Sequence, residues 1–243
     1  MGILLTFDVE PDLHTMKYKS VVLGIPRILN LLRKYGKKGI FFTTCDCIER
    51  YPEIFLELKR QGHEIALHGY RHIRYDTLSV NEIEEEIKKA IYVFNKYLSI
   101  KPMGFRAPQH SINGNTLNLL EKYNFEYDSS YTPFNVLQFF FFPKKLRLNF
   151  TNFFSPLNPY QVRPKLKEMP TSSLLIPFVS LTIRVLPKLF LRAYINLIKI
   201  VYNKPVFYSH SWDFMNVSGS KIDKLFSHKS FIKKLDYVLR LEK

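Results

Sequence analysis

A nearly unbroken alternation of strand-like and helix-like apolar segments most constrains how this chain can fold. Residues 3–7 have the pattern of a buried strand, and apolar side chains then recur at helical spacing from Val22 to Leu32. Further strand patterns lie at 39–44, 63–68, 103–106, 125–128, 166–169 and 206–209. Such alternation predicts a parallel sheet with helical crossovers. Seven strands without a glycine-rich dinucleotide motif favour a single-domain barrel over residues 1–243, rather than an open doubly wound sheet.

Local signals mark several helix ends and one irregular region. Pro52 stands at an expected first helical position, and Ser79 with Glu82 forms a capping-box pattern before an apolar repeat. Leu225 to Leu239 carry the apolar positions of a final helix. Residues 131–164 break the rhythm, because they hold five prolines and a run of four phenylalanines. We expect a long loop excursion there, of the kind that often forms a lid or a binding loop.

Chemically capable polar side chains follow the ends of the predicted strands. In chain order they are Asp8, Glu10, His68, Arg106, Asp128, Glu168 and His210. The carboxyl ends of the strands in a parallel barrel converge on one face, where catalytic residues gather. The set as a whole therefore predicts an active site at that face.

Two pairs within this set suggest a metal site. His68 and His72 are four residues apart, so on one helical turn they would face the same direction and share a metal ion. Asp8 and Glu10 are separated by one residue, so in an extended strand both side chains point to the same side. One carboxylate can then bind metal while the other acts as a base. Two histidines and one carboxylate leave coordination positions open, as catalytic zinc sites require.

Four ordered motifs resemble those of the polysaccharide deacetylase family (carbohydrate esterase family four). They are Thr6-Phe7-Asp8-Val9-Glu10, His68-Gly69-Tyr70-Arg71-His72, Arg106-Ala107-Pro108 and Tyr208-Ser209-His210-Ser211-Trp212. Their order and intervals match over nearly the whole chain. The resemblance implies a distorted (β/α)7 barrel. Most members have two adjacent aspartates in the first motif; the D-V-E spacing here is similar to that of a branch resembling exopolysaccharide-biosynthesis deacetylases.

The resemblance also implies a role for each motif residue. Asp8 matches the catalytic base, Arg106 the arginine that orients it, and His210 the catalytic acid. Glu10, His68 and His72 match the ligands of a divalent metal, usually Zn²⁺, with Co²⁺, Ni²⁺, Mn²⁺ or Fe²⁺ as alternatives. The implied activity is metal-dependent hydrolysis of the acetamido group of an amino sugar in a glycan, an oligosaccharide or a lipid-linked sugar.

Other residues are candidates for supporting roles. A carboxylate hydrogen-bonded to His210 would hold its positive charge, and Asp128 and Glu168 are both candidates for that role. Tyr70 and Trp212 are candidates for a hydrophobic wall facing an acetyl methyl group or a sugar face, and His110 for the lining of the cleft.

The net charge of +15 fits either a generally lysine-rich surface or attraction to an anionic partner. The anionic partners considered are a cytoplasmic membrane leaflet, a diphosphate-linked sugar and nucleic acid. Nucleic acid ranks last because the lysines are scattered and lack basic-aromatic motifs. Residues 174–202 are apolar with interspersed basic residues, too many to span a bilayer. They predict a buried barrel helix or an amphipathic surface resting on a membrane.

The expected location is cytoplasmic, with peripheral contact at the inner membrane face as a variant. Residues 2–7 are too short for a signal peptide and lack a basic flank. Cys45 and Cys47, which a strand would point to one face, lack the second pair that a zinc site needs. Reduced structural thiols agree with a cytosolic location.

Two other functions remain open from the sequence. The first is C–N hydrolysis of a small non-sugar compound such as a ureide or an imide. The second is a non-catalytic carbohydrate-binding relative, which would lack the base, a metal ligand or the acid. An open groove favours a glycan substrate, whereas a closed small pocket favours a small amide.

Overall fold

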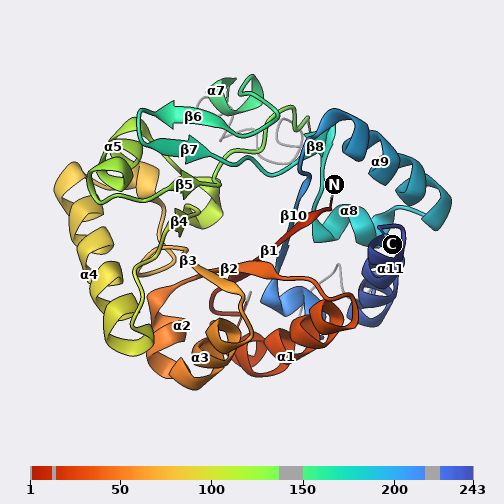
Figure 1. Cartoon of the computed structure of the whole chain (residues 1–243), viewed down its shortest axis with the longest axis horizontal. Helices are drawn as coiled ribbons and strands as arrows, with labels where there is room; N and C mark the ends of the chain where they lie inside the picture. Colours follow the sequence, from red (N-terminus) through yellow and green to blue (C-terminus); the bar gives the residue numbers. More distant parts are fainter. Residues whose placement is uncertain (1, 13–14, 137–149, 217–224, 243) are drawn as a thin grey trace.

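The computed structural model describes residues 2–12, 15–136, 150–216 and 225–242. An eight-stranded sheet curls around the centre of the molecule, and helices cover its outside (Figure 1). The strand order is β10-β1-β2-β3-β4-β5-β7-β6, and every neighbouring pair is parallel except the last. This arrangement confirms the predicted single parallel barrel of seven strands, with β6 added as an antiparallel edge.

The strands lie close to their predicted positions. Their bounds are β1 Leu4–Val9, β2 Gly39–Thr43, β3 Glu64–Leu67, β4 Gly104–Phe105, β5 Tyr127–Asp128, β6 Tyr160–Arg163, β7 Leu166–Glu168 and β10 Val206–His210. In the ladder between β1 and β10, Asp8 pairs with His210. The first residue of β1 is half-buried and the other five are buried, because β1 lies between β10 and β2 under a layer of helices.

The barrel is distorted because the sheet does not close on itself. Between β7 and β10 the chain forms the short hairpin β8 (Ser173–Leu174) and β9 (Ile176–Pro177), which is a separate two-stranded sheet. Single contacts bridge the remaining gap: the Ser172 amide donates to the Val206 carbonyl, and the Tyr208 amide donates to the Phe178 carbonyl. This opening lies beside β10 and leaves room for the residues that line the cleft described below.

The helices follow the predicted crossovers. They are α1 Lys19–Lys34, α2 Cys45–Arg50, α3 Pro52–Arg60, α4 Val80–Leu98, α5 Gly114–Lys122, α7 Phe150–Phe153, α8 Ser180–Val185, α9 Lys188–Val201 and α11 His228–Arg240. Pro52 is the first residue of α3, and Ser79 and Glu82 form the predicted capping box of α4. No helix in the described ranges is long and apolar enough to cross a membrane.

Three expectations about local structure are wrong. Cys45 and Cys47 lie at the start of α2 instead of on a strand, because the chain turns into a helix directly after β2; both are buried free thiols. Leu225 precedes the final helix and is exposed. The excursion at 131–164 contains α7 and β6 among its described residues, while its middle part, 137–149, with the phenylalanine run, lies outside them.

Candidate active site

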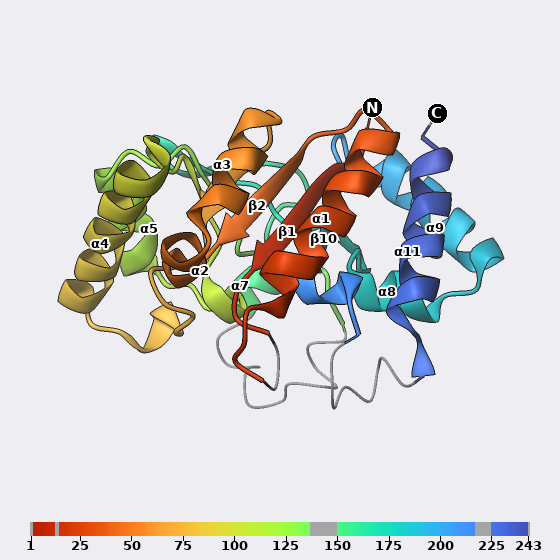
Figure 2. The same ribbon diagram turned by 90° about the horizontal axis from the view of Figure 1, so that it is seen from below.

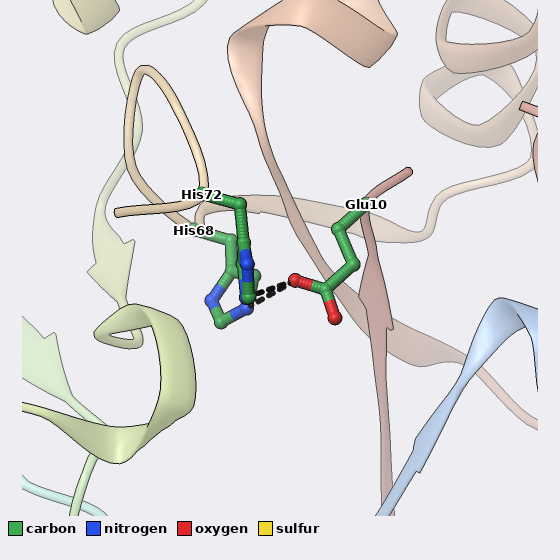
Figure 3. A group of neighbouring side chains, drawn as sticks. All are labelled: Glu10, His68 and His72. Atoms are coloured by element: carbon green, nitrogen blue, oxygen red, sulfur yellow. Dashed lines mark ion pairs between the residues drawn. The ribbon is translucent and has the colours of Figure 1, made fainter. Parts of the chain in front are cut away.

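Glu10, His68 and His72 form a candidate metal site at the carboxyl ends of β1 and β3. Each residue offers one ligand atom, and the three atoms lie within 4.8 Å of one another. Figure 3 shows the Glu10 carboxylate facing the two imidazole rings. Glu10 and His68 are buried, and the His72 side chain is 25% exposed. The sequence-predicted ligand set is therefore brought together by the fold.

The expectation that the two histidines share a helical turn is wrong. Residues 68–74 form an irregular turn, in which Gly69 has a φ of +88°. A Cβ atom there would lie 2.7 Å from the Arg71 carbonyl oxygen, so glycine is required for both space and conformation. The Arg71 amide and guanidinium both donate to the buried carboxylate of Glu86 on α4, which anchors the turn. The two imidazole rings end 5.4 Å apart.

The donor set fits a divalent ion. The buried Oε2 atom of Glu10 makes no hydrogen bond and faces the Nε2 atoms of both histidines. His68 Nδ1 lies 2.8 Å from the Arg106 carbonyl oxygen, so Nδ1–H donates there and Nε2 keeps its lone pair for a ligand bond. Burial would raise the pKa of Glu10, but the two histidines outweigh it and lower the pKa. An ionised carboxylate and two oriented imidazoles are ligands that Zn²⁺ accepts.

Asp8 lies beside this group and is held by Arg106. The guanidinium Nη1 donates to Asp8 Oδ1 at 2.8 Å, and both side chains are buried. The other oxygen, Oδ2, lies 3.4 Å from His68 Nε2. Burial alone would raise the pKa of Asp8, but His68 and Arg106 outweigh it, so the carboxylate stays ionised.

Arg106 is itself fixed on every side. Its guanidinium carbon lies 4.0 Å from the centre of the Phe42 ring and 5.0 Å from that of Tyr208. The remaining donors reach the Thr6 hydroxyl and the Ser129 carbonyl and hydroxyl oxygens. A fully buried arginine with this many partners cannot change its side-chain conformation without losing several hydrogen bonds. Arg106 therefore defines one orientation of the Asp8 carboxylate.

His210 faces the same space from the end of β10. Its Nε2 atom lies 2.7 Å from the Tyr208 hydroxyl and 3.6 Å from Glu10 Oε1. Its ring stacks on Trp212 with centroids 4.1 Å apart. Asp213 lies behind it: Oδ2 accepts from the His210 amide at 2.9 Å and is 3.7 Å from Nδ1. Burial alone would lower the pKa of His210, but Asp213 and Glu10 raise it above its usual value.

These residues share one cleft with a volume of about 600 Å³. Asp8, Glu10, His68, His72 and His210 line it, and Arg106 lies directly behind Asp8. The other lining residues are Gln109, Val179, Ser180, Leu181, Arg184, Tyr208, Trp212 and Asp213. Gln109, at its rim, and the next residue, His110, have φ values of +55° and +54°, a strained conformation for residues other than glycine. The base candidate, the candidate metal ligands and the acid candidate thus open onto a single space.

Comparison with known sequences agrees with this geometry. The sequence model of the polysaccharide deacetylase family matches residues 2–127, more than half of the chain, and the match includes Asp8, Glu10, His68, His72 and Arg106. The chain belongs to the polysaccharide deacetylase family. A curated relative, the peptidoglycan deacetylase of Helicobacter pylori, is 30% identical over 119 residues, which cover 47% of this chain and 41% of that protein. The chain thus spans less than half the length of the relative that it matches.

Solved structures show the deacetylase fold over the whole chain. A protein of Mycobacterium smegmatis that carries the polysaccharide deacetylase name superimposes with a TM-score of 0.71 at 21% identity, covering 99% of this chain and 84% of that one. Puue allantoinase gives a TM-score of 0.67 at 15% identity, covering 99% and 83%. At these identities the likeness concerns the fold alone. The superposition extends past residue 127, where the family sequence match ends, and so includes the strand that carries His210.

Asp213 is the carboxylate that contacts His210 in this deacetylase cleft. The sequence had suggested Asp128 or Glu168 for this position. Asp128 and Glu168 are register partners on β5 and β7, both fully buried, and they hydrogen-bond each other. Asp128 also accepts from the Ser130 amide and hydroxyl, and Glu168 from the Tyr131 amide. Burial and the Asp128 charge raise the pKa of Glu168 well above its usual value, so this pair shares a proton. Occupied with each other, the two carboxyls do not orient His210.

The three residues that the sequence suggested for contact with substrate lie in different parts of the structure. Trp212 lines the cleft. His110 lies behind it, with Nδ1 2.9 Å from the Ser130 carbonyl oxygen and its ring against the Tyr208 ring; burial lowers the pKa of His110 to about 4. Tyr70 is not among the lining residues. Its carbonyl oxygen accepts from the Cys45 amide at the start of α2, so Tyr70 lies beside that helix.

Sequence reasoning missed Asp213, Tyr208 and Arg184. Asp213 is three residues beyond His210 in a short 3₁₀ turn, Ser211–Phe214, that folds the carboxylate back onto the histidine. Buried Arg184 on α8 donates to the Asp213 carbonyl and carboxylate oxygens and holds the turn from the other side. A carboxylate at this interval after a candidate histidine was the available signal in the sequence.

The contact between Asp213 and His210 predicts a change in the pH profile. His210 must be protonated to act as an acid, so activity falls as pH rises through its pKa. Asp213→Asn removes the charge that raises this pKa, and we expect the alkaline limit of kcat/KM to move to lower pH. Glu168→Gln is the matched control and should leave that limit unchanged. The assignment is wrong if Glu168→Gln moves the limit and Asp213→Asn does not.

Proposed function

We propose that this chain is a metal-dependent N-deacetylase that hydrolyses the acetamido group of an amino sugar in a glycan, an oligosaccharide or a lipid-linked sugar. The observation that carries the proposal is the meeting of three groups in one cleft. They are a candidate ligand set, an arginine-held carboxylate and a carboxylate-supported imidazole, and they come from the carboxyl ends of β1, β3, β4 and β10. Hydrolysis of an amide needs an activated water, a base and an acid, and each group supplies one of these needs.

Glu10, His68 and His72 would hold the metal. A divalent ion there, Zn²⁺ in our proposal, supplies a Lewis acid that polarises the amide carbonyl and lowers the pKa of water to ~7. Asp8 takes the proton from the attacking water through Oδ2, because Oδ1 is engaged by Arg106. The ion pair with Arg106 keeps this carboxylate ionised and aimed before the reaction begins.

His210 then protonates the leaving nitrogen. An amine is a poor leaving group without a proton, so the acid is as necessary as the base. Asp213 favours the imidazolium form, and the face of Trp212 stacked on the ring stabilises a cation. The Tyr208 hydroxyl at 2.7 Å fixes the orientation of Nε2 toward the cleft. Asp8 and His210, on neighbouring strands, thus approach the amide together.

The apolar part of the cleft suits an acetyl group. Trp212 and Leu181 line it together with Val179. We propose that these side chains surround the acetyl methyl group or one sugar face. The printed names of the curated relatives, among them the Helicobacter pylori peptidoglycan deacetylase and a Bacillus cereus peptidoglycan-N-acetylglucosamine deacetylase, support an N-acetylated glycan as the substrate class.

A second candidate is hydrolysis of a small non-sugar amide. The similarity in fold to Puue allantoinase supports this candidate, because the two structures superimpose over 99% of the chain described here. A cytoplasmic location, which would suit a metabolite or a precursor on the inner leaflet, remains part of our proposal. A non-catalytic relative is disfavoured because base, ligand set and acid candidates all lie in place.

A substrate screen tests the proposal. The chain is supplied with zinc and assayed for acetate and free amine with N-acetylated oligosaccharides, peptidoglycan fragments, nucleotide sugars, lipid-linked sugars, and cyclic ureides and imides. We expect acetate release from an N-acetylated glycan, and none from the Asp8→Asn variant. Turnover of ureides alone would replace the proposal with the second candidate, and no turnover of any compound would overturn both.

A further inference from the structure

Helices α8 and α9 carry several large apolar side chains that are open to water. Its members are Leu181 (40% exposed), Val185 (47%), Leu189 (77%), Phe190 (64%), Leu197 (51%) and Ile200 (80%), here called the apolar face. Isolated exposed apolar residues are ordinary, but several on one side of a helix mark an interaction surface. Leu189, Leu197 and Ile200 recur at intervals of eight and three residues, so they share one side of α9.

The apolar face is not needed for packing within the barrel. The opposite side of α9 is buried through Leu191, Ile195 and Ile198, and these residues already attach the helix to the core. A helix that is apolar on both sides fits a position between a protein core and a second apolar phase. With 14 residues, α9 offers a contact length of about 21 Å.

The charged side chains of the segment that forms α8 and α9 have one sign. From Met169 to Trp212 the sequence contains no acidic residue, whereas it contains five basic ones. Lys188 and Arg192 of α9 and Lys204 after it are exposed. Cations that flank an apolar helical surface match a bilayer whose headgroups are anionic, and each one near such a surface contributes ~1 kcal/mol.

We propose that the apolar face docks this protein on an anionic phospholipid bilayer. Leu189, Phe190 and Ile200 enter the boundary between headgroups and acyl chains, while Lys188 and Arg192 lie against the headgroups. A second copy of the chain is a poorer occupant, because the flanking cations of two copies would repel each other.

One member of the apolar face also lines the cleft. Leu181 and Arg184 of α8 line the cleft, and Leu181 also belongs to the apolar face. Helix α9 follows directly and returns to the start of β10, so its first turn, with Leu189 and Phe190, lies toward the carboxyl ends of the strands (Figure 2). Docking would place the cleft at the bilayer surface. If the proposed deacetylase activity holds, on which this step rests, the substrate class is a lipid-linked amino sugar.

Vesicle binding tests the docking directly. The full chain is sedimented with phosphatidylcholine vesicles that contain phosphatidylglycerol, and with vesicles of phosphatidylcholine alone. We expect binding to the anionic vesicles that weakens as salt increases. The double variant Leu189→Ser/Phe190→Ser should bind at least about tenfold more weakly, because it removes two large apolar side chains from the contact. Lys188→Gln/Arg192→Gln should bind more weakly and depend less on salt.

The matched control is Val22→Ser/Leu23→Ser, which changes two adjacent exposed apolar residues on α1, on another side of the barrel (Figure 1). It should bind as the unchanged chain does. Equal binding by the Leu189/Phe190 variant would overturn the proposal. So would absence of vesicle binding together with a dimer in sedimentation that this variant abolishes, because a second copy would then cover the face.

Activity assays on the variants distinguish a failure of docking from a failure of catalysis. Asp8→Asn should bind vesicles normally, so a failure of the proposed activity leaves the docking test intact. In the active chain, a lipid-linked N-acetyl sugar in anionic vesicles should be hydrolysed faster than the free sugar. Leu189→Ser/Phe190→Ser should lose that preference while keeping its rate on the free sugar. An unchanged preference in this variant would contradict the link between the apolar face and the substrate.

Discussion

Asp8→Asn should lower kcat for deacetylation by about a hundredfold to ten-thousandfold, the contribution of a positioned general base. The asparagine side chain has nearly the same size, and its oxygen can still accept from Arg106 Nη1, which lies 2.8 Å from Asp8 Oδ1. It has no carboxylate to take a proton from water. The measurement is acetate release under saturating substrate, combined with metal content and thermal unfolding of the purified variant.

Metal content should stay at the level of the unchanged chain, since Glu10, His68 and His72 form the ligand group. Asp236→Asn is a suitable control, because this carboxylate pairs with Lys34 and Arg240 on the surface and should not affect the rate. Full activity in Asp8→Asn would show that another group is the base. Loss of metal together with activity would instead make Asp8 a ligand.

His72→Ala should weaken metal binding more than about a hundredfold, because removing even an outer partner of a ligand costs 10–100-fold. His72 is partly exposed at the end of an irregular turn, so the variant should keep its fold. Activity should fall with bound metal and should return in part at high zinc concentration. In the unchanged chain, a chelator should abolish activity and added zinc should restore it.

His63→Gln provides the comparison for this experiment. His63 lies at the other end of β3, where Nδ1 accepts from the Gly39 amide, and it contacts none of the three ligands. Its replacement should leave metal affinity unchanged. Activity that survives complete removal of metal, or equal affinities in His72→Ala and the unchanged chain, would contradict the proposed ligand set.

The sequence predicted the barrel and the strand ends well, for a physical reason. Buried parallel strands appear as short apolar runs, and the first polar residue after each run must lie at the catalytic face. Asp8, His68, Arg106 and His210 were found in this way, and the structure brings them together. Glu10 follows from the two-residue period of an extended chain.

The partners of these residues could not be predicted in the same way. Asp128 and Glu168 also end strands, but their strands are neighbours in register, so the two carboxyls meet each other instead of His210. Asp213 reaches His210 only because a 3₁₀ turn reverses the chain and Arg184, from a helix thirty residues earlier, holds that turn. The Gly69 turn likewise depends on Glu86 of α4. Contacts of this kind depend on tertiary packing, which local periodicity does not report.

The pairing of Asp8 with His210 in the β1–β10 ladder has a consequence for how such a site can change over time. The spacing between the proposed base and the proposed acid is set by main-chain hydrogen bonds of adjacent strands, about 4.8 Å apart, and not by the conformation of a loop. A slip of one residue would turn the acid to the opposite face of the sheet. Insertions and deletions in the loops above therefore leave the catalytic spacing intact. Substrate preference can diverge in this fold while the reaction itself is conserved by the backbone.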